Sequence, residues 1–223
     1  MGNITVDESF YNILAGIDDP VIQSRIIAFV KQVKIEDNYD LCAVRFAKPI
    51  EFYEAIGKAK QNNDYGAFVE QRTIEEYSKM KYLFLTLDGS AGIAVTSDND
   101  IVSLFNGGKV RNVMKTLIPL AIAVGGEKLD SYDSNRLSIM YEGYGFYPVS
   151  SVRFSIRFAP KDWNYQRDGR PDILFWIHNN DSPAEVVKNM NGYLVDRSRI
   201  RRCSMYTMAR SVRDKVIFYN KKY

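Results

Sequence analysis

Hydrophobic and polar residues follow two different periods along the chain, and the period changes near residue 82. Between residues 18 and 81, apolar side chains mostly recur every three or four positions, which is typical of a helix with one buried face. Residues 82–106 instead contain three short runs rich in β-branched and aromatic side chains, separated by Asp-Gly-Ser and Ser-Asp-Asn. Because Asp-Gly between apolar runs favours a hairpin, we expect three antiparallel strands that form a meander.

Two helices before the meander have recognisable starts. Asp19 followed by Pro20 is typical of a helix N-terminus, and apolar residues at helical spacing follow it. Thr73 followed by Glu76 completes a capping box. The elements expected up to the end of the meander are helices over 18–34, over 50–61 and from about residue 73, a short strand over 41–46, and strands over 82–87, 91–96 and 100–106.

Beyond the meander, helices alternate with strands. We expect a helix over 110–124 that Pro119 kinks or ends early and that Gly125 and Gly126 terminate. The elements expected after it are a strand over 127–133, a helix over 134–145, a strand over 146–158, a loop over 159–171, a strand over 172–178 and a mostly helical C-terminal segment.

This order of elements predicts the α+β class, with a mostly antiparallel sheet flanked by helices. The third and fourth strands of the core are joined by a helical crossover, which makes them parallel. A parallel pair inside an otherwise antiparallel sheet leaves a gap where its strands splay apart. We divide the chain into an N-terminal helical extension (1–40), a core (41–182) and a basic C-terminal helical segment (183–223).

Charge is distributed unevenly along the chain. The formal net charge is +3, whereas residues 183–223 carry ten Lys or Arg against three Asp or Glu. Such a segment suits a solvated helix, a helix docked on the acidic body or an anion-binding patch. The basic cluster at 197–202 lacks interleaved aromatic residues, so we do not expect nucleic acid as a partner.

Few residues suit metal or nucleophilic chemistry. Cys42 and Cys203 lie far apart and His178 is the single histidine, so the sequence has no metal-ligand spacing and no Cys–His pair. The chain also lacks a run of about 18 apolar residues and the pattern of a secretion signal. We therefore expect a soluble, cytoplasmic protein with no metal and no membrane partner, in which both cysteines are ordinary thiols.

Residues 140–146, Met-Tyr-Glu-Gly-Tyr-Gly-Phe, end a predicted helix and lead directly into a strand. Together with the order of elements over 82–178, they resemble the core of the Gcn5-related N-acetyltransferases, whose signature helix ends in Tyr-x-x-x-Gly-Phe. The likeness covers less than half of the chain. A weaker likeness, to uncharacterised proteins of phages and mobile elements with GDIVS-like and LDxY-like segments, implies no activity.

The resemblance implies an acetyl-CoA site in the gap between the third and fourth strands of the core. The pantetheine arm pairs there with exposed backbone, and the pyrophosphate meets unpaired amides at the start of the crossover helix. The family pattern at this turn is Arg/Gln-x-x-Gly-x-Gly/Ala, whereas this chain has Asn-Gly-Gly-Lys-Val-Arg. The residues implied for cofactor binding are Phe105, Asn106, Gly107, Gly108, Lys109, Val110 and Asn135.

Tyr141 is the catalytic residue that the resemblance implies, as the general acid that protonates the leaving thiolate of coenzyme A. Its position on the inward face of its helix also fits an ordinary core residue. Gly145 permits a sharp turn after the helix, and Phe146 packs the helix onto the sheet. The candidates for the general base are Asp130, Asp133 and Glu142, and the sequence does not favour one of them.

These residues favour an N-acyltransferase that moves an acetyl group from acetyl-CoA to an amine by direct attack. The alternative is a catalytically inactive protein of the same fold, derived from a phage or mobile element, that binds a protein partner. The loop over 160–172 contains Trp163, Tyr165, Arg167 and Arg170. It lines an acceptor cleft, forms a protein interface, or is a long connection pinned by Trp163.

Overall fold

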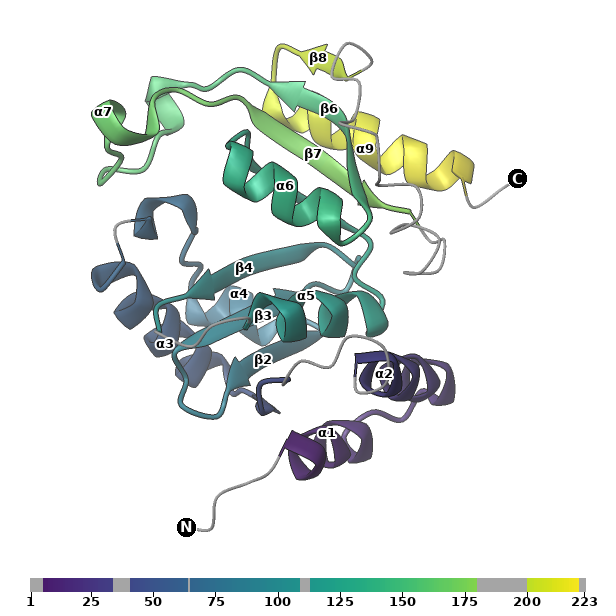
Figure 1. Ribbon diagram of the computed structural model, residues 1–223. Coiled ribbons are helices and arrows are strands. Elements are labelled where there is room, and N and C mark those ends of the chain that lie inside the picture. Colours follow the sequence, from purple (N-terminus) through teal and green to yellow (C-terminus); the bar gives the residue numbers. More distant parts are fainter. Residues whose placement is uncertain (1–5, 34–40, 64, 109–112, 180–199, 221–223) are drawn as a thin grey trace. The chain divides into compact units, whose positions relative to one another are not determined.

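The computed structural model describes residues 6–33, 41–63, 65–108, 113–179 and 200–220 of the chain. The chain forms two compact units, an N-terminal unit over Met1–Gly126 and a C-terminal unit over Glu127–Tyr223. Each unit contains one four-stranded sheet and its own helices (Figure 1). The boundary at Gly126 falls inside the segment 41–182 that the sequence suggests as one core.

The N-terminal unit is built around an antiparallel meander. Its strands pair in chain order, β1-β2-β3-β4. Its elements are α1 (Val6–Ala15), α2 (Pro20–Gln32), β1 (Val44–Phe46), α3 (Pro49–Gln61), a short 3₁₀ helix (Gly66–Phe68), α4 (Ile74–Ser78), β2 (Tyr82–Thr86), β3 (Ala91–Val95), β4 (Ile101–Asn106) and α5 (Met114–Ala123).

Local signals account for most of these boundaries. The Asp19 side chain accepts from the first amides of α2, and Thr73 forms the expected capping box with Glu76 at the start of α4. Two turns connect the strands of the meander, and they place Gly89 at φ 69° and Asn99 at φ 65°. Glycine and asparagine tolerate this left-handed conformation, so the sequence has turn-compatible residues where the chain reverses.

The helix α3 covers one face of this sheet and packs an apolar cluster against it. Phe52 and Ile56 of α3 are fully buried and pack with Leu85 of β2, Phe105 of β4 and Tyr77 of α4. The Phe52 ring lies edge-on to the rings of both Tyr77 and Phe105, with centroid distances of 4.9 Å and 5.5 Å. Burying rings of this size stabilises the unit strongly, at about 25 cal/mol per Å² of apolar surface.

The C-terminal unit has a mixed sheet in the order β5-β7-β6-β8. β7 pairs antiparallel with β5 and β6, and β6 pairs in parallel with β8. Its elements are β5 (Lys128–Tyr132), α6 (Asn135–Gly143), β6 (Phe146–Val152), a short 3₁₀ helix (Ile156–Phe158), α7 (Tyr165–Asp168), β7 (Ile173–His178), β8 (Arg201–Cys203) and α9 (Tyr206–Asn220).

The predicted α+β class is confirmed, and several details of the prediction need correction. The parallel pairing that the hydrogen bonds define joins β6 to β8, whereas the third and fourth core strands, β4 and β5, belong to different sheets. β6 ends at Val152, a short 3₁₀ helix lies within the rest of the segment expected as strand, and β8 was not expected. The helical segment expected near 182–190 lies outside the described residues.

Pro119 does not end α5, which continues four residues beyond it. The helix stops where Gly125 adopts a φ of 102° and the Gly126 amide donates to the Ala121 carbonyl at 2.8 Å. Both cysteines are free thiols, as expected. None of the helices in the described ranges is both long and apolar enough to cross a membrane.

Candidate functional site

β4 contains a β-bulge in the last strand of the N-terminal sheet. In its register with β3, Ser103 and Leu104 lie opposite the single residue Ile93. Ser103 has a φ of 51°, in the left-handed region that residues other than glycine rarely adopt. A bulge leaves the backbone of its extra residue unpaired, and β4 is terminal in the sheet as described. The strand therefore presents an irregular backbone edge rather than a regular ladder.

A chain of hydrogen bonds holds the strained serine in place. The Arg72 amide donates to the Tyr77 hydroxyl at 3.1 Å, and this hydroxyl lies 3.1 Å from Ser103 Oγ. Ser103 Oγ in turn donates to the Glu70 carbonyl at 3.3 Å. Since Tyr77 is only 1% exposed, burial raises the pKa of its hydroxyl. We call Ser103, Tyr77 and Glu70 the bulge clamp.

The bulge also changes which side chains of β4 reach the core. In a regular strand, residues three positions apart point to opposite faces. Val102 and Phe105 nevertheless pack in the same cluster, against α3 and α4. The extra residue between them restores their common face, so the bulge is part of the packed fold and not a local distortion.

The turn after β4 is closed by its own contacts. The Gly107 amide donates to the Ser90 carbonyl at 2.9 Å, and the Gly108 amide donates to Oδ1 of Asn106 at 3.1 Å. These two amides are not the unpaired donors that the sequence suggested for a pyrophosphate. A Cβ on Gly107 would lie 2.5 Å from the Cα of Ala59 in α3, so close packing explains this glycine.

The other residues proposed for cofactor binding are dispersed. The Phe105 side chain is 3% exposed and belongs to the core, so only its backbone is available to a ligand. Asn135 is an exposed residue at the first position of α6, which Ser134 caps. Lys109 and Val110 lie outside the described residues.

Tyr141 lies on the buried face of α6 among aromatic side chains. Its ring is 6.1 Å from that of Phe146 and 5.9 Å from that of Trp176 in β7, measured between centroids. The turn between them contains Gly145 at φ 81°, and Phe146 is 2% exposed. The expected sharp turn and the expected packing of Phe146 on the sheet are confirmed.

The Tyr141 hydroxyl is unusual because it has no hydrogen-bond partner among the described residues. The residue is 7% exposed, and burial, with a smaller contribution from the negative charge of Asp130, raises the pKa of the hydroxyl well above its ordinary value. Within the described ranges, Arg72 Nε is the one fully buried side-chain polar atom without a partner. The Tyr141 hydroxyl is thus a nearly buried group in an aromatic setting, which suits a group that donates to a ligand.

The remaining titratable candidates have structural contacts. Ser138 Oγ donates to Asp133 at 3.4 Å, at the start of α6. His178 ends β7, where its ring lies edge-on to Phe146 at 5.1 Å and its amide donates to the Glu127 carbonyl. In the described part of the chain, no three His, Cys, Asp or Glu residues form a group able to hold a metal ion. The general base remains open.

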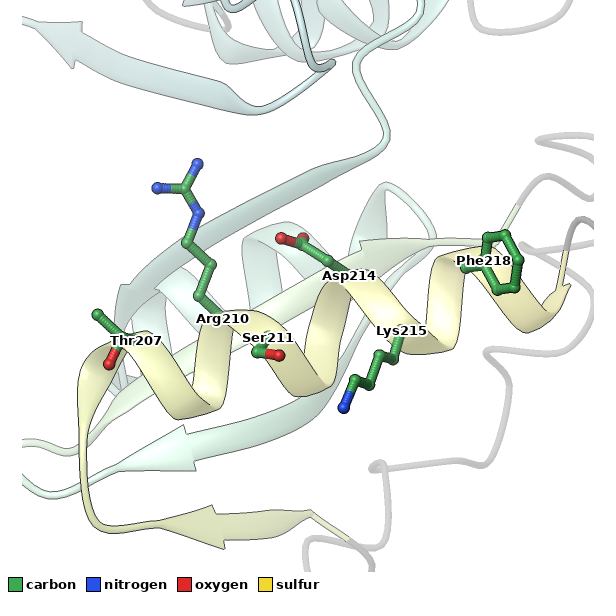
Figure 2. Close-up of a pocket in the computed structure, with 6 residues that line it drawn as sticks. All are labelled: Thr207, Arg210, Ser211, Asp214, Lys215 and Phe218. Carbon is green, nitrogen blue, oxygen red and sulfur yellow. The ribbon is translucent and has the colours of Figure 1, made fainter.

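A pocket in the C-terminal unit lies along α9 and contains none of the predicted site residues (Figure 2). Its carboxylate, Asp214, already contacts Lys128 Nζ at 3.3 Å and Arg213 Nε at 3.1 Å. The pocket is therefore a charged groove whose acid is held in ion pairs, and it offers no acid–base pair. Its lining residues are Thr207, Arg210, Ser211, Asp214, Lys215 and Phe218.

Comparison of the chain with protein-family models, curated proteins and solved structures gave no match. The feature that sequence reasoning missed is the bulge at Ser103. A polar residue inside the run Ile-Val-Ser-Leu-Phe, where Val102 and Phe105 break the period of two, is the signal that indicates it.

Proposed function

We propose that the protein is an N-acyltransferase that uses acetyl-CoA as donor, with β4 as the donor strand. The bulge at Ser103 is the observation that carries this proposal. Bulges are over-represented next to active sites because they redirect backbone groups out of the ladder. An amide redirected in this way is suited to donate a hydrogen bond to the carbonyl oxygen of a thioester.

The reaction is a direct transfer. The unprotonated amine attacks the thioester carbonyl carbon, the new C–N bond forms, and negative charge collects on the carbonyl oxygen. An amide fixed by the bulge clamp stabilises this charge without having to reorganise. The C–S bond then breaks, and a base or water accepts the proton that the amine loses.

Tyr141, in the C-terminal unit, is the general acid that the resemblance implies for the departing thiolate. Its raised pKa keeps the hydroxyl protonated throughout the neutral range, so the donor form is always present. The same shift makes the hydroxyl a weak acid. We therefore expect its contribution at the low end of the range for general acid catalysis, about 10²-fold.

The closed turn after β4 favours a second candidate function. If Gly107 and Gly108 keep their internal hydrogen bonds, their amides do not bind a pyrophosphate. A protein of this architecture without a donor site is then an inactive scaffold that binds a protein partner. Calorimetric titration with coenzyme A and acetyl-CoA separates the two candidates, since only the enzyme binds either ligand.

The variant Tyr141→Phe tests the catalytic role separately from the structural one. We expect it to lower kcat about 10²-fold in an assay of released thiol and to leave acetyl-CoA affinity unchanged. The free energy of unfolding stays the same or rises slightly, because the hydroxyl makes no hydrogen bond among the described residues. An active enzyme whose kcat is unaffected by Tyr141→Phe contradicts the assignment and leaves Tyr141 as a core residue.

A further inference from the structure

The connection between β6 and β7 exposes aromatic side chains at its surface. Phe158 is 78% exposed and Tyr165 is 43% exposed. Together with α7 and the short 3₁₀ helix, the connection extends beyond the ends of β6 and β7 (Figure 1). Large rings exposed in this way are candidate contacts for a partner when other features of the same connection support them.

A buried aromatic group supports these exposed rings. Trp163 is 6% exposed, and its ring packs at a tilt against Tyr132 and Phe154, with centroid distances of 4.5 Å and 5.3 Å. Its Nε1 donates to the Gly169 carbonyl at 3.0 Å. The Tyr165 ring lies edge-on to Phe154 at 6.2 Å. The prediction that Trp163 anchors the connection is confirmed, because its buried ring and its hydrogen bond hold the connection in place.

The charges on the connection are positive and mostly uncompensated. The cations Arg153, Arg157, Lys161 and Arg170 are exposed and have no carboxylate partner in the part of the chain that the structure describes. The acids are fewer, and two of them are engaged. Asp168 is held by Arg167 at 2.6 Å, and Asp172 is held by Arg202 at 3.0 Å.

Two of the free cations accompany the exposed rings. The guanidinium of Arg157 lies 5.6 Å from the centroid of Phe158, and that of Arg170 lies 5.9 Å from the centroid of Tyr165. Each pair therefore places a positive charge next to an aromatic ring. Single-stranded nucleic acid offers the matching combination, a base that stacks and a phosphate that follows it.

We propose that this surface binds single-stranded nucleic acid, with Phe158 and Tyr165 stacking on bases and Arg153, Arg157, Lys161 and Arg170 contacting phosphates. We call these six residues the β6–β7 platform. The basic cluster at 197–202 lacks aromatic residues, whereas the platform supplies both components of such a site. The unpaired positive charge favours nucleic acid over a protein partner, whose interface core would be poor in uncompensated charge.

The test is fluorescence anisotropy of a labelled oligouridylate of about 12 nucleotides with the full chain, a length within the usual range of single-strand sites. We expect the double variant Phe158→Ala with Tyr165→Ala to raise Kd about tenfold or more. The double variant Arg157→Ala with Arg170→Ala should reduce the slope of log K against log salt by about 1.4. Both changes are on exposed side chains, so the melting temperature should not move.

Matched controls use exposed residues elsewhere in the chain. Ile139→Ala removes a side chain that is 67% exposed on α6, and Arg25→Ala removes an exposed cation of α2. Neither should change Kd or its salt dependence. Failure of the oligonucleotide to bind at about 50 mM salt overturns the proposal and leaves a protein as the occupant of the platform. Binding that the ring and arginine variants do not weaken overturns it in favour of the basic C-terminal segment.

Discussion

The bulges in β4 and β6 are the same kind of irregularity in two different settings. In β6, Val149 is the extra residue between Pro148 and Ser150 in the pairing with β7. β6 has neighbours on both sides, and none of its residues has a positive φ. In β4, the bulge lies in a terminal strand and forces a serine into the left-handed region.

The contacts around the two bulges explain the difference. Ser150 is fully buried and donates to the Ala209 carbonyl of α9 at 2.7 Å, so the β6 bulge serves packing. Ser103 is only partly buried, and its hydroxyl contacts the Tyr77 hydroxyl of α4 and the Glu70 carbonyl. The β4 bulge is the one that combines a costly backbone conformation with a terminal strand, and this combination suits a binding role.

The largest effect should come from Ser103→Val, because a β-branched residue is strongly disfavoured at positive φ. We expect acetyl-CoA affinity to fall at least about tenfold, together with a loss of about 1 to 2 kcal/mol in the free energy of unfolding. Calorimetry and urea unfolding measure the two quantities.

Ser103→Gly is the matched control, because glycine accepts the same φ and the change removes only the short CH₂OH side chain. Its acetyl-CoA affinity should stay within about threefold of the unmodified protein. Equal losses in the valine and glycine variants would show that the serine hydroxyl, not the backbone geometry, supports the donor site.

The corresponding change in β6 should affect stability alone. Ser150→Ala removes the buried hydrogen bond to the Ala209 carbonyl, which should cost about 0.5 to 1.5 kcal/mol in urea unfolding. Acetyl-CoA affinity should not change. A variant that remains folded but loses donor binding would remove the distinction between the two bulges.

Tyr77→Phe weakens the clamp while keeping the ring that packs on Phe52. It removes the hydroxyl that links the Arg72 amide to Ser103, so we expect a loss of about 1 kcal/mol in unfolding free energy. Acetyl-CoA affinity should fall by less than in Ser103→Val. An affinity loss as large as that of the valine variant would mean that the clamp alone determines the backbone geometry.

Alkaline pH should have the smallest effect on the free energy of unfolding. Its effect distinguishes the two buried tyrosines, Tyr141 and Tyr77. The pKa of Tyr141 is raised in the folded state, so the unfolded chain loses this proton first and stability falls as pH rises above about 10. By about pH 10.5 the loss due to Tyr141 alone should be about 0.8 kcal/mol. Tyr141→Phe should remove this part of the pH dependence and leave that of Tyr77, and an unchanged slope would contradict the burial of the hydroxyl.

Sequence reasoning succeeded where structure is determined locally. The capping residues Asp19 and Thr73, the glycines that end α5 and the turn at Gly145 each specify backbone geometry within a few residues. The inward position of Tyr141 follows from helical periodicity for the same reason.

It failed where partners are distant in the chain. The three residues of β8 pair with β6, about fifty positions earlier, and nothing in their own sequence indicates a strand. The glycines at 107 and 108 suggested an anion site because their packing against Ala59 and Ser90 is not visible in the sequence. Whether the Tyr141 hydroxyl finds a hydrogen-bond partner also depends on residues distant in the chain, so the sequence could not show it.

The most direct test of the donor site is a nuclear magnetic resonance titration that follows backbone amides as acetyl-CoA is added to the full chain. We predict that the amides of Ser103 and Leu104 show the largest shifts at saturation, while those of Val149 and Ser150 in the β6 bulge do not move. Saturating acetyl-CoA that leaves the β4 amides unchanged would contradict the proposal that this bulge receives a thioester.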